Sequence, residues 1–86
     1  MGEYAKLYEH VIVRRSDANV PFVGLCGLLR RLGFEERIKG NHHIFTSDYV
    51  EEILNLQPKN GKGKPYQVKQ VRGVIVKYNL TLEDRS

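Results

Sequence analysis

The feature that most constrains the fold is a change in hydrophobic period at Gly33. Before this glycine, apolar residues recur at helical spacing from Phe22 to Leu32, which predicts an amphipathic helix that ends at Gly33. After it, Phe34 and Ile38 fall on one side of the chain and charged residues on the other, which predicts a half-buried strand. One core must therefore accept both a helix and a sheet, and the expected class is α+β.

Two further strands are expected to complete an antiparallel meander. Gly40 and Asn41 suit a tight turn after Lys39, so the chain should return as a strand over residues 42–46. Ser47 and Asp48 are typical of a second turn, and residues 50–56 then form a third strand. The middle of the chain is thus predicted to be a three-stranded antiparallel sheet.

Helices are expected on both sides of this meander in the sequence. Tyr4, Leu7, Tyr8, Val11 and Ile12 recur at helical spacing and predict a first helix that ends near residues 14–15. Residues 59–64 form a loop rich in glycine and lysine. Residues 65–78 contain a β-branched run, yet their apolar positions also recur at helical spacing, which favours a helix. The expected architecture packs helices on one face of a small sheet.

The length of 86 residues allows one domain with one core. We expect a single domain over residues 1–86, with an N-terminal helical extension over 1–18 and a core over 20–80. The single cysteine, Cys26, lies among apolar residues and is expected to be buried, since it has no partner for a disulfide within the chain. The N-terminus resembles neither a signal peptide nor a membrane span, so a cytoplasmic location is expected.

Basic side chains concentrate in the last third of the chain. The formal net charge is +4, and residues 57–82 contain six basic side chains and no carboxylate. This pattern favours a polyanionic partner, and nucleic acid rather than a membrane because no strongly apolar helix face accompanies the charge. A solvated basic surface is the alternative. The candidates for phosphate contact are Lys39, Lys59, Lys62, Lys64, Lys69 and Arg72.

The candidates for proton transfer are His42 and His43, which directly follow the predicted turn. Neighbouring strand residues face opposite ways, so both rings cannot act on one substrate atom; the alternative is that both are ordinary sheet residues. Adjacent histidines diverge, and the chain has no HxH or HxxxH spacing, so neither a metal nor another cofactor is expected. The lysine loop lacks the spacing of a phosphate-binding loop for nucleoside triphosphates.

Two runs stand out beside the basic C-terminal helix: LLRRLGF at residues 28–34 and GNHHIF at residues 40–45. Together they resemble the HicA family of toxins from bacterial toxin–antitoxin systems, over about residues 22–80. The resemblance implies a double-stranded-RNA-binding-domain-like fold of helix, three strands and helix, with the N-terminal helix outside the family core. It also implies cleavage of mRNA by one histidine, without a cofactor, and a HicB-like antitoxin that covers the active site.

The family's histidine follows a glycine-serine turn, so the resemblance places the catalytic role on His42, with His43 as the alternative because some members carry it one position later. Asn41 stands where serine is usual. The chemistry agrees, because RNA supplies its own 2′-hydroxyl nucleophile and needs only proton transfer and charge stabilisation. A histidine acid or base typically contributes ~10² to 10⁴ in rate.

Two other functions fit parts of the same sequence. A non-catalytic RNA-binding module would use the basic C-terminal region to recognise RNA by shape and phosphate contact, and it would not need either histidine. A protein-interaction module would bind an acidic partner through the same surface, with an affinity that falls as salt rises.

Overall fold

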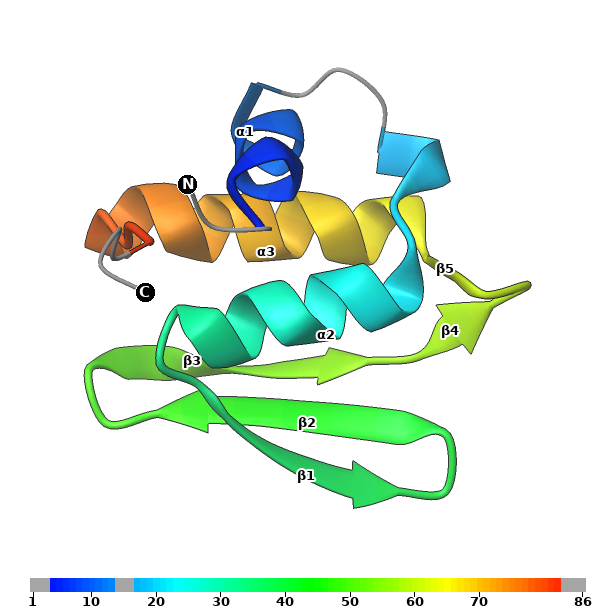
Figure 1. Ribbon diagram of the computed structural model, residues 1–86. Coiled ribbons are helices and arrows are strands. Elements are labelled where there is room, and N and C mark those ends of the chain that lie inside the picture. Colours follow the sequence, from blue (N-terminus) through cyan, green and yellow to red (C-terminus); the bar gives the residue numbers. More distant parts are fainter. Residues whose placement is uncertain (1–3, 14–16, 83–86) are drawn as a thin grey trace.

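The computed structural model describes residues 4–13 and 17–82 and contains three helices, a short 3₁₀ helix and five strands in those ranges. Figure 1 shows their arrangement. In chain order the elements are α1 (Ala5–Val13), η1 (Asp17–Asn19), α2 (Phe22–Arg31), β1 (Glu35–Lys39), β2 (His42–Ser47), β3 (Val50–Leu56), β4 (Pro58–Lys59), β5 (Lys62–Gly63) and α3 (Pro65–Tyr78).

The three central strands form an antiparallel sheet in the order β1-β2-β3, as the alternating pattern predicts. Gly40 has a φ of +63°, which the turn between β1 and β2 requires and which glycine adopts without steric cost. The second turn lies at Asp48 and Tyr49, one residue later than expected. Ser47 instead ends β2, and its hydroxyl accepts a hydrogen bond from the Tyr49 amide at 3.3 Å.

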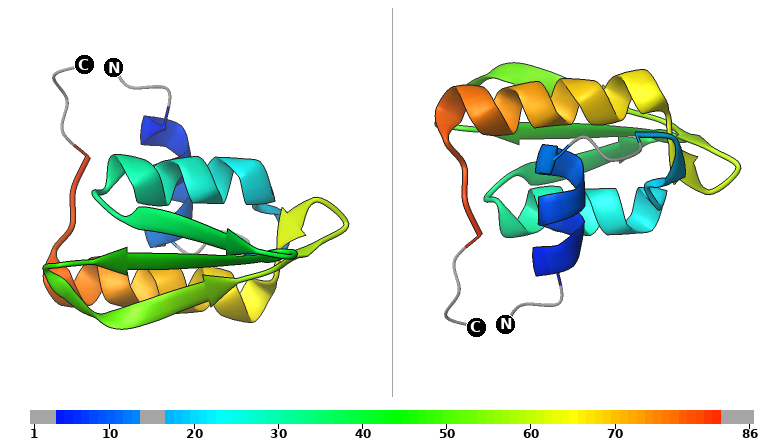
Figure 2. Two further views of the ribbon diagram at one scale, coloured as in Figure 1. Left: turned by 90° about the horizontal axis from the view of Figure 1, so that it is seen from below. Right: turned by 90° about the horizontal axis from the view of Figure 1, so that it is seen from above.

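The molecule has three layers, with α2 and α3 side by side on one face of the sheet and α1 across them on the far side (Figures 1 and 2). This confirms the α+β class and the expected three-stranded antiparallel sheet. The core lies between the sheet and the helices, and the opposite face of the sheet is left to solvent. The largest fully buried side chains of the core are Phe45, Leu25, Leu28, Leu29, Leu54, Leu56, Ile75, Val11, Val20, Val68 and Val71.

The helix α1 belongs to the packed structure. Val11 is fully buried in the core, and Leu7, Tyr8 and Ile12 pack against it. The Tyr8 hydroxyl donates a hydrogen bond to the Leu80 carbonyl at 2.6 Å, which joins α1 to the segment after α3. The expected end of this helix near residues 14–15 lies outside the described residues.

Two local expectations from the sequence were wrong. Ile38 is 59% exposed, because it lies on β1 at the edge of the sheet. Residues 59–64 are not an open loop, since β4 and β5 pair around a turn at Asn60 and Gly61, both with positive φ. The Phe22 amide donates to the Gly61 carbonyl at 2.9 Å, so this hairpin is held against the start of α2.

The helix α3 begins and ends where the sequence predicts, despite its β-branched run. Pro65 occupies the first turn, where the missing amide hydrogen costs no helical hydrogen bond. Asn79 adopts a left-handed conformation with φ 54° and ends the helix, and the Leu80 amide then bonds back to the Ile75 carbonyl at 3.0 Å. Across residues 4–13 and 17–82, none of the helices has the length and apolar character needed to cross a membrane.

Candidate functional site

The β1–β2 hairpin directs the two histidines to opposite faces of the sheet. Lys39 and His42 are paired in register on either side of the two-residue turn. His42 lies on the solvent-facing side and is exposed, whereas His43 lies on the side covered by α2 and is half-buried. The expectation that the two rings diverge is therefore confirmed, and each histidine has its own surroundings.

The ring of His42 is held by a neighbouring strand. Its Nδ1 lies 3.1 Å from the Oδ1 of Asn55 on β3. An amide oxygen only accepts hydrogen bonds, so the neutral ring carries its proton on Nδ1 and keeps a lone pair on Nε2. Alternation along β3 puts Asn55 on the exposed face, but nothing in the sequence pairs it with a histidine 13 positions away.

A buried glutamine from α3 supports this strand. Gln67 is only 5% exposed; its Nε2 donates to the Asn55 carbonyl at 3.3 Å, and its Oε1 accepts from the Gln57 amide at 3.1 Å. Gln67 stands among polar residues of α3, of which Lys69 and Gln70 are exposed, so its burial is not evident from the sequence. The side chain bonds the backbone of β3 at Asn55 and the amide of Gln57 just after the strand, which holds in place the backbone that carries Asn55.

A second polar chain links the same strand end to the hairpin turn. The Gln57 Nε2 donates to the Oδ1 of Asn41 at 3.3 Å, and the Lys64 ammonium donates to the Oε1 of Gln57 at 3.1 Å. Asn41 directly precedes His42 in the chain. The side chain of Gln57 therefore connects the Lys64 ammonium to Asn41 in the turn beside His42.

The remaining lysines divide between two places. Lys59 and Lys62 pair in register on the β4–β5 hairpin, which lies at the same end of the sheet as the β1–β2 turn (Figure 1), and the Lys62 ammonium donates to Asn19 Oδ1 at 3.3 Å. Lys69 is exposed on α3 and lines a groove with Ile12 of α1. Lys69 is thus not grouped with the hairpin.

Arg72 is buried, although the sequence had predicted it among the side chains that contact phosphate. Its side chain is 8% exposed and forms two hydrogen bonds to the Asp17 carboxylate, at 2.9 and 3.2 Å, and one to the Val11 carbonyl at 3.2 Å. A guanidinium that is buried needs such partners, because an uncompensated charge in the interior is costly. The residue holds α1, η1 and α3 together and is removed from the candidate RNA contacts.

The ring of His43 lies in a cluster between the sheet and α2. Its Nδ1 is 2.6 Å from Glu36 Oε2 and 4.0 Å from Cys26 Sγ. The Phe22 ring packs edge-on against it, with centroids 4.9 Å apart. Arg30 forms an ion pair with the other oxygen of Glu36. Cys26 is buried, as predicted.

The pKa values of two residues in this cluster, Glu36 and Cys26, reflect these contacts. Burial acts to raise the pKa of the Glu36 carboxyl, but hydrogen bonds from His43 and Arg30 outweigh it and hold this pKa below its usual value. Burial, with a smaller contribution from the Glu36 charge, raises the pKa of the Cys26 thiol to about 11. The thiol is therefore protonated at neutral pH and is a poor nucleophile.

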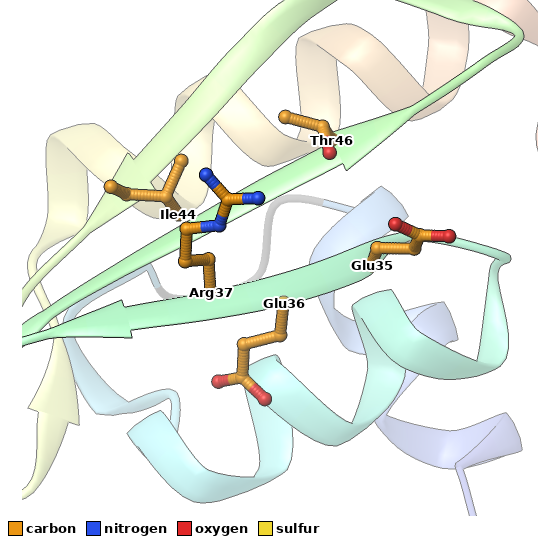
Figure 3. A pocket seen from close by; sticks show the side chains of 5 residues that line it. All are labelled: Glu35, Glu36, Arg37, Ile44 and Thr46. Atoms are coloured by element: carbon orange, nitrogen blue, oxygen red, sulfur yellow. The ribbon is translucent and has the colours of Figure 1, made fainter.

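The exposed face of the sheet carries a shallow hollow of about 250 Å³ along β1 and β2. Figure 3 shows the five residues that line it, Glu35, Glu36, Arg37, Ile44 and Thr46; the Glu36 side chain leaves β1 toward α2. Ile44 is two residues from His42 on the same face, because alternate residues of a strand point the same way. The hollow thus continues the surface on which His42 lies.

Comparisons with protein-family models, with curated proteins and with solved structures produced no match to this chain.

Proposed function

We propose that this protein is a HicA-like toxin, an endoribonuclease that cleaves mRNA without a metal and uses His42 for proton transfer. The observation that carries the proposal is the environment of His42, an exposed ring whose Nδ1 is anchored on Asn55 at 3.1 Å. The anchor leaves the Nε2 lone pair of the neutral ring directed away from Asn55 and available to a bound substrate. The resemblance of residues 28–34 and 40–45 to HicA toxins points to the same side chain.

In the proposed reaction, Nε2 of His42 takes the proton of a ribose 2′-hydroxyl as its oxygen attacks the adjacent phosphorus. The bond to the 5′-oxygen breaks, and that oxygen receives a proton from water or a cationic side chain. The products are a 2′,3′-cyclic phosphate and a 5′-hydroxyl end. The hydrogen bond from His42 to Asn55 suits a general base, because Asn55 orients the ring and stabilises the positive charge that the ring carries transiently.

Stabilisation of the developing phosphorane charge falls to the nearest cations. Lys39 is paired with His42 across the turn, and Lys64 is tied through Gln57 to Asn41. Preorganised cations beside the reacting phosphate stabilise a transition state without reorganising as the charge forms. Lys59 and Lys62 on the neighbouring hairpin are suited to grip the RNA backbone further along.

His42 is favoured over His43 because RNA is a long polymer that needs an open surface. His43 faces α2, packs against Phe22 and is bound to Glu36. The serine usual in this family is replaced by Asn41, whose side-chain oxygen is already bonded to Gln57, so the turn is supported without a hydroxyl.

The proposal extends to the finer fold and to the partners. The order α2-β1-β2-β3-α3, with both helices on one face of the sheet, agrees with a double-stranded-RNA-binding-domain-like fold. The toxin would act in the cytoplasm and be held inactive by a HicB-like antitoxin that covers the exposed face bearing His42. Because lysines surround His42 at this end of the sheet, the affinity of the antitoxin for the toxin should fall as the salt concentration rises.

The test is cleavage of a 5′-labelled single-stranded RNA of mixed sequence, with EDTA present throughout. The wild-type protein should cleave, and His42→Ala should lower the single-turnover rate by ~10² to 10⁴ while its RNA affinity stays within about threefold. A 2′-O-methyl RNA of the same sequence serves as the matched control, because it should bind to the wild type but not be cut.

The alternatives have distinct outcomes. Loss of cleavage in His43→Gln together with full activity in His42→Ala would move the catalytic role to His43. RNA retention without cleavage by any variant would identify a non-catalytic RNA-binding module. Equal cleavage by wild type and His42→Ala would refute the proposal, provided that both proteins show the same circular dichroism spectrum.

A further inference from the structure

A second cluster of reactive side chains lies on the opposite side of β2 from His42, and the proposed ribonuclease chemistry does not use it. Cys26 comes from α2, Glu36 from β1 and His43 from β2, and their ligand atoms all lie within 4.8 Å of one another. The three residues are spread over 18 positions, in three different elements. We propose that Cys26, Glu36 and His43 form a binding site for a divalent ion of the zinc class.

The donor set selects the kind of ion. A thiolate, an imidazole nitrogen and a carboxylate oxygen are the ligands that Zn²⁺ takes in proteins, whereas Mg²⁺ and Ca²⁺ prefer oxygen donors alone. Bound metal deprotonates a coordinating thiol outright, so the proton of Cys26 passes to solvent as the sulfur–metal bond forms. Binding should therefore strengthen as the pH rises.

The distances are close to those of a metal centre. Zinc bonds of about 2.3 Å to sulfur and about 2.1 Å to nitrogen and oxygen place tetrahedral ligands about 3.6 Å (S to N) and about 3.4 Å (N to O) apart. The observed separations are 4.0 Å for Cys26 Sγ to His43 Nδ1 and 2.6 Å for His43 Nδ1 to Glu36 Oε2. The ion would replace the hydrogen bond between Glu36 and His43, so the ring would present Nδ1 without a proton and carry its proton on Nε2. The two ligand atoms would move apart by about 0.8 Å.

The surroundings already hold the ligands in place. Arg30 pairs with Glu36 Oε1 and leaves Oε2 directed at His43, as a partner outside a metal site commonly orients its carboxylate ligand. The Phe22 ring packs edge-on against His43. The cluster is largely shielded, since the Glu36 side chain is 13% exposed and that of His43 21% exposed. Figure 3 shows the Glu36 side chain directed from β1 toward α2.

Three protein ligands leave a fourth tetrahedral position for water or another small ligand. The ion would also connect α2 to the β1–β2 hairpin, whose other face carries His42. Because neither His42 nor Asn55 is among the three ligands, the metal site and the proposed ribonuclease site can be tested separately.

The test is titration of the reduced, metal-free wild-type protein with Co²⁺, followed by competition with Zn²⁺. The expected spectrum has visible bands of tetrahedral intensity and a sulfur-to-cobalt charge-transfer band in the near ultraviolet, saturating at one equivalent and lost when Zn²⁺ is added. Since this measurement uses the wild-type protein, it does not depend on any variant folding. Absence of the charge-transfer band at saturating Co²⁺ would overturn the proposal.

Variants then identify the ligands. Cys26→Ser should lose the charge-transfer band, and His43→Gln and Glu36→Gln should each weaken Co²⁺ binding at least 10-fold, in line with the loss of one ligand from a small site. His42→Ala is the matched control, because it removes the neighbouring histidine from the other face and should leave the spectrum unchanged. Retention of one-equivalent binding in His43→Gln, or its loss in His42→Ala, would assign the metal elsewhere and refute this site.

Discussion

Removing the Asp17 carboxylate should leave the Arg72 guanidinium buried without the partner that binds it through two hydrogen bonds. Arg72 is 8% exposed on its side chain and Asp17 is 26% exposed, and the two are 2.9 Å apart at closest approach. Breaking a fully buried pair costs about 3 to 5 kcal/mol. Because water reaches Asp17, we expect Asp17→Ala to lower the free energy of unfolding by about 2 to 3 kcal/mol.

That loss is large for a chain of this size. Domains of about this length have a total stability of roughly 4 to 13 kcal/mol, and each kcal/mol shifts Tm by roughly 4 to 8 °C. Asp17→Ala should therefore lower Tm by about 10 to 20 °C. The companion Arg72→Met keeps much of the apolar stem and leaves only a partly solvated carboxylate behind, so it should cost about 1 to 2 kcal/mol.

The assay is urea denaturation followed by circular dichroism for the wild type, both single variants and the double variant. A coupling energy of about 1 kcal/mol or more is expected between the two positions. The cycle isolates the pair from the other contacts that each residue makes. Effects of the two substitutions that add to within about 0.5 kcal/mol would refute the structural role of Arg72. A cost of Asp17→Ala below about 0.5 kcal/mol would refute it as well, and Arg72 would again be a candidate for RNA contact.

Two further predictions concern α3. Hydrogen bonds from Lys77 and then Tyr78 lower the pKa of Glu52 from 4.5 to about 2, so Glu52 contributes stability above pH 4.5 that is lost as the pH falls toward 2. Glu52→Gln should therefore destabilise the protein at pH 6 and no longer at pH 2, as urea midpoints across that range would reveal; a constant difference would contradict it. Gln67→Leu removes the hydrogen bonds to the Asn55 carbonyl and the Gln57 amide, so it should cost about 1 to 3 kcal/mol and slow RNA cleavage, whereas Gln70→Leu, on an exposed position of the same helix, should do neither.

Much of the fold could be predicted because its signals are local. The apolar spacing of α2 and α3, the glycine at the β1–β2 turn and the alternation along β3 each act over a few residues, and the elements lie where those patterns predict. The divergence of His42 and His43 is also a local property, since strand geometry alone decides it. The charge of residues 57–82 is visible in the sequence in the same way.

Some local patterns misled because burial is decided by neighbours distant in sequence. Ile38 has the alternation of a buried strand residue, but it lies on the edge strand β1 and is exposed. Gln67 and Arg72 have the helical spacing of a solvated polar face, yet both are buried among partners 10 to 61 positions away. Spacing along one helix does not reveal which elements pack against that face.

The sequence by itself determined the three α-helices and the three central strands in their order, the position of both histidines after a tight turn and the uneven distribution of charge, because φ/ψ preferences and turn chemistry depend on a few neighbouring residues. Only the tertiary structure decided which polar groups meet. The pairing of His42 with Asn55, the burial of Arg72 on Asp17 and the convergence of Cys26 and Glu36 all depend on strand register and helix packing. Such contacts form between distant residues, and their energies depend on the burial that the whole fold creates.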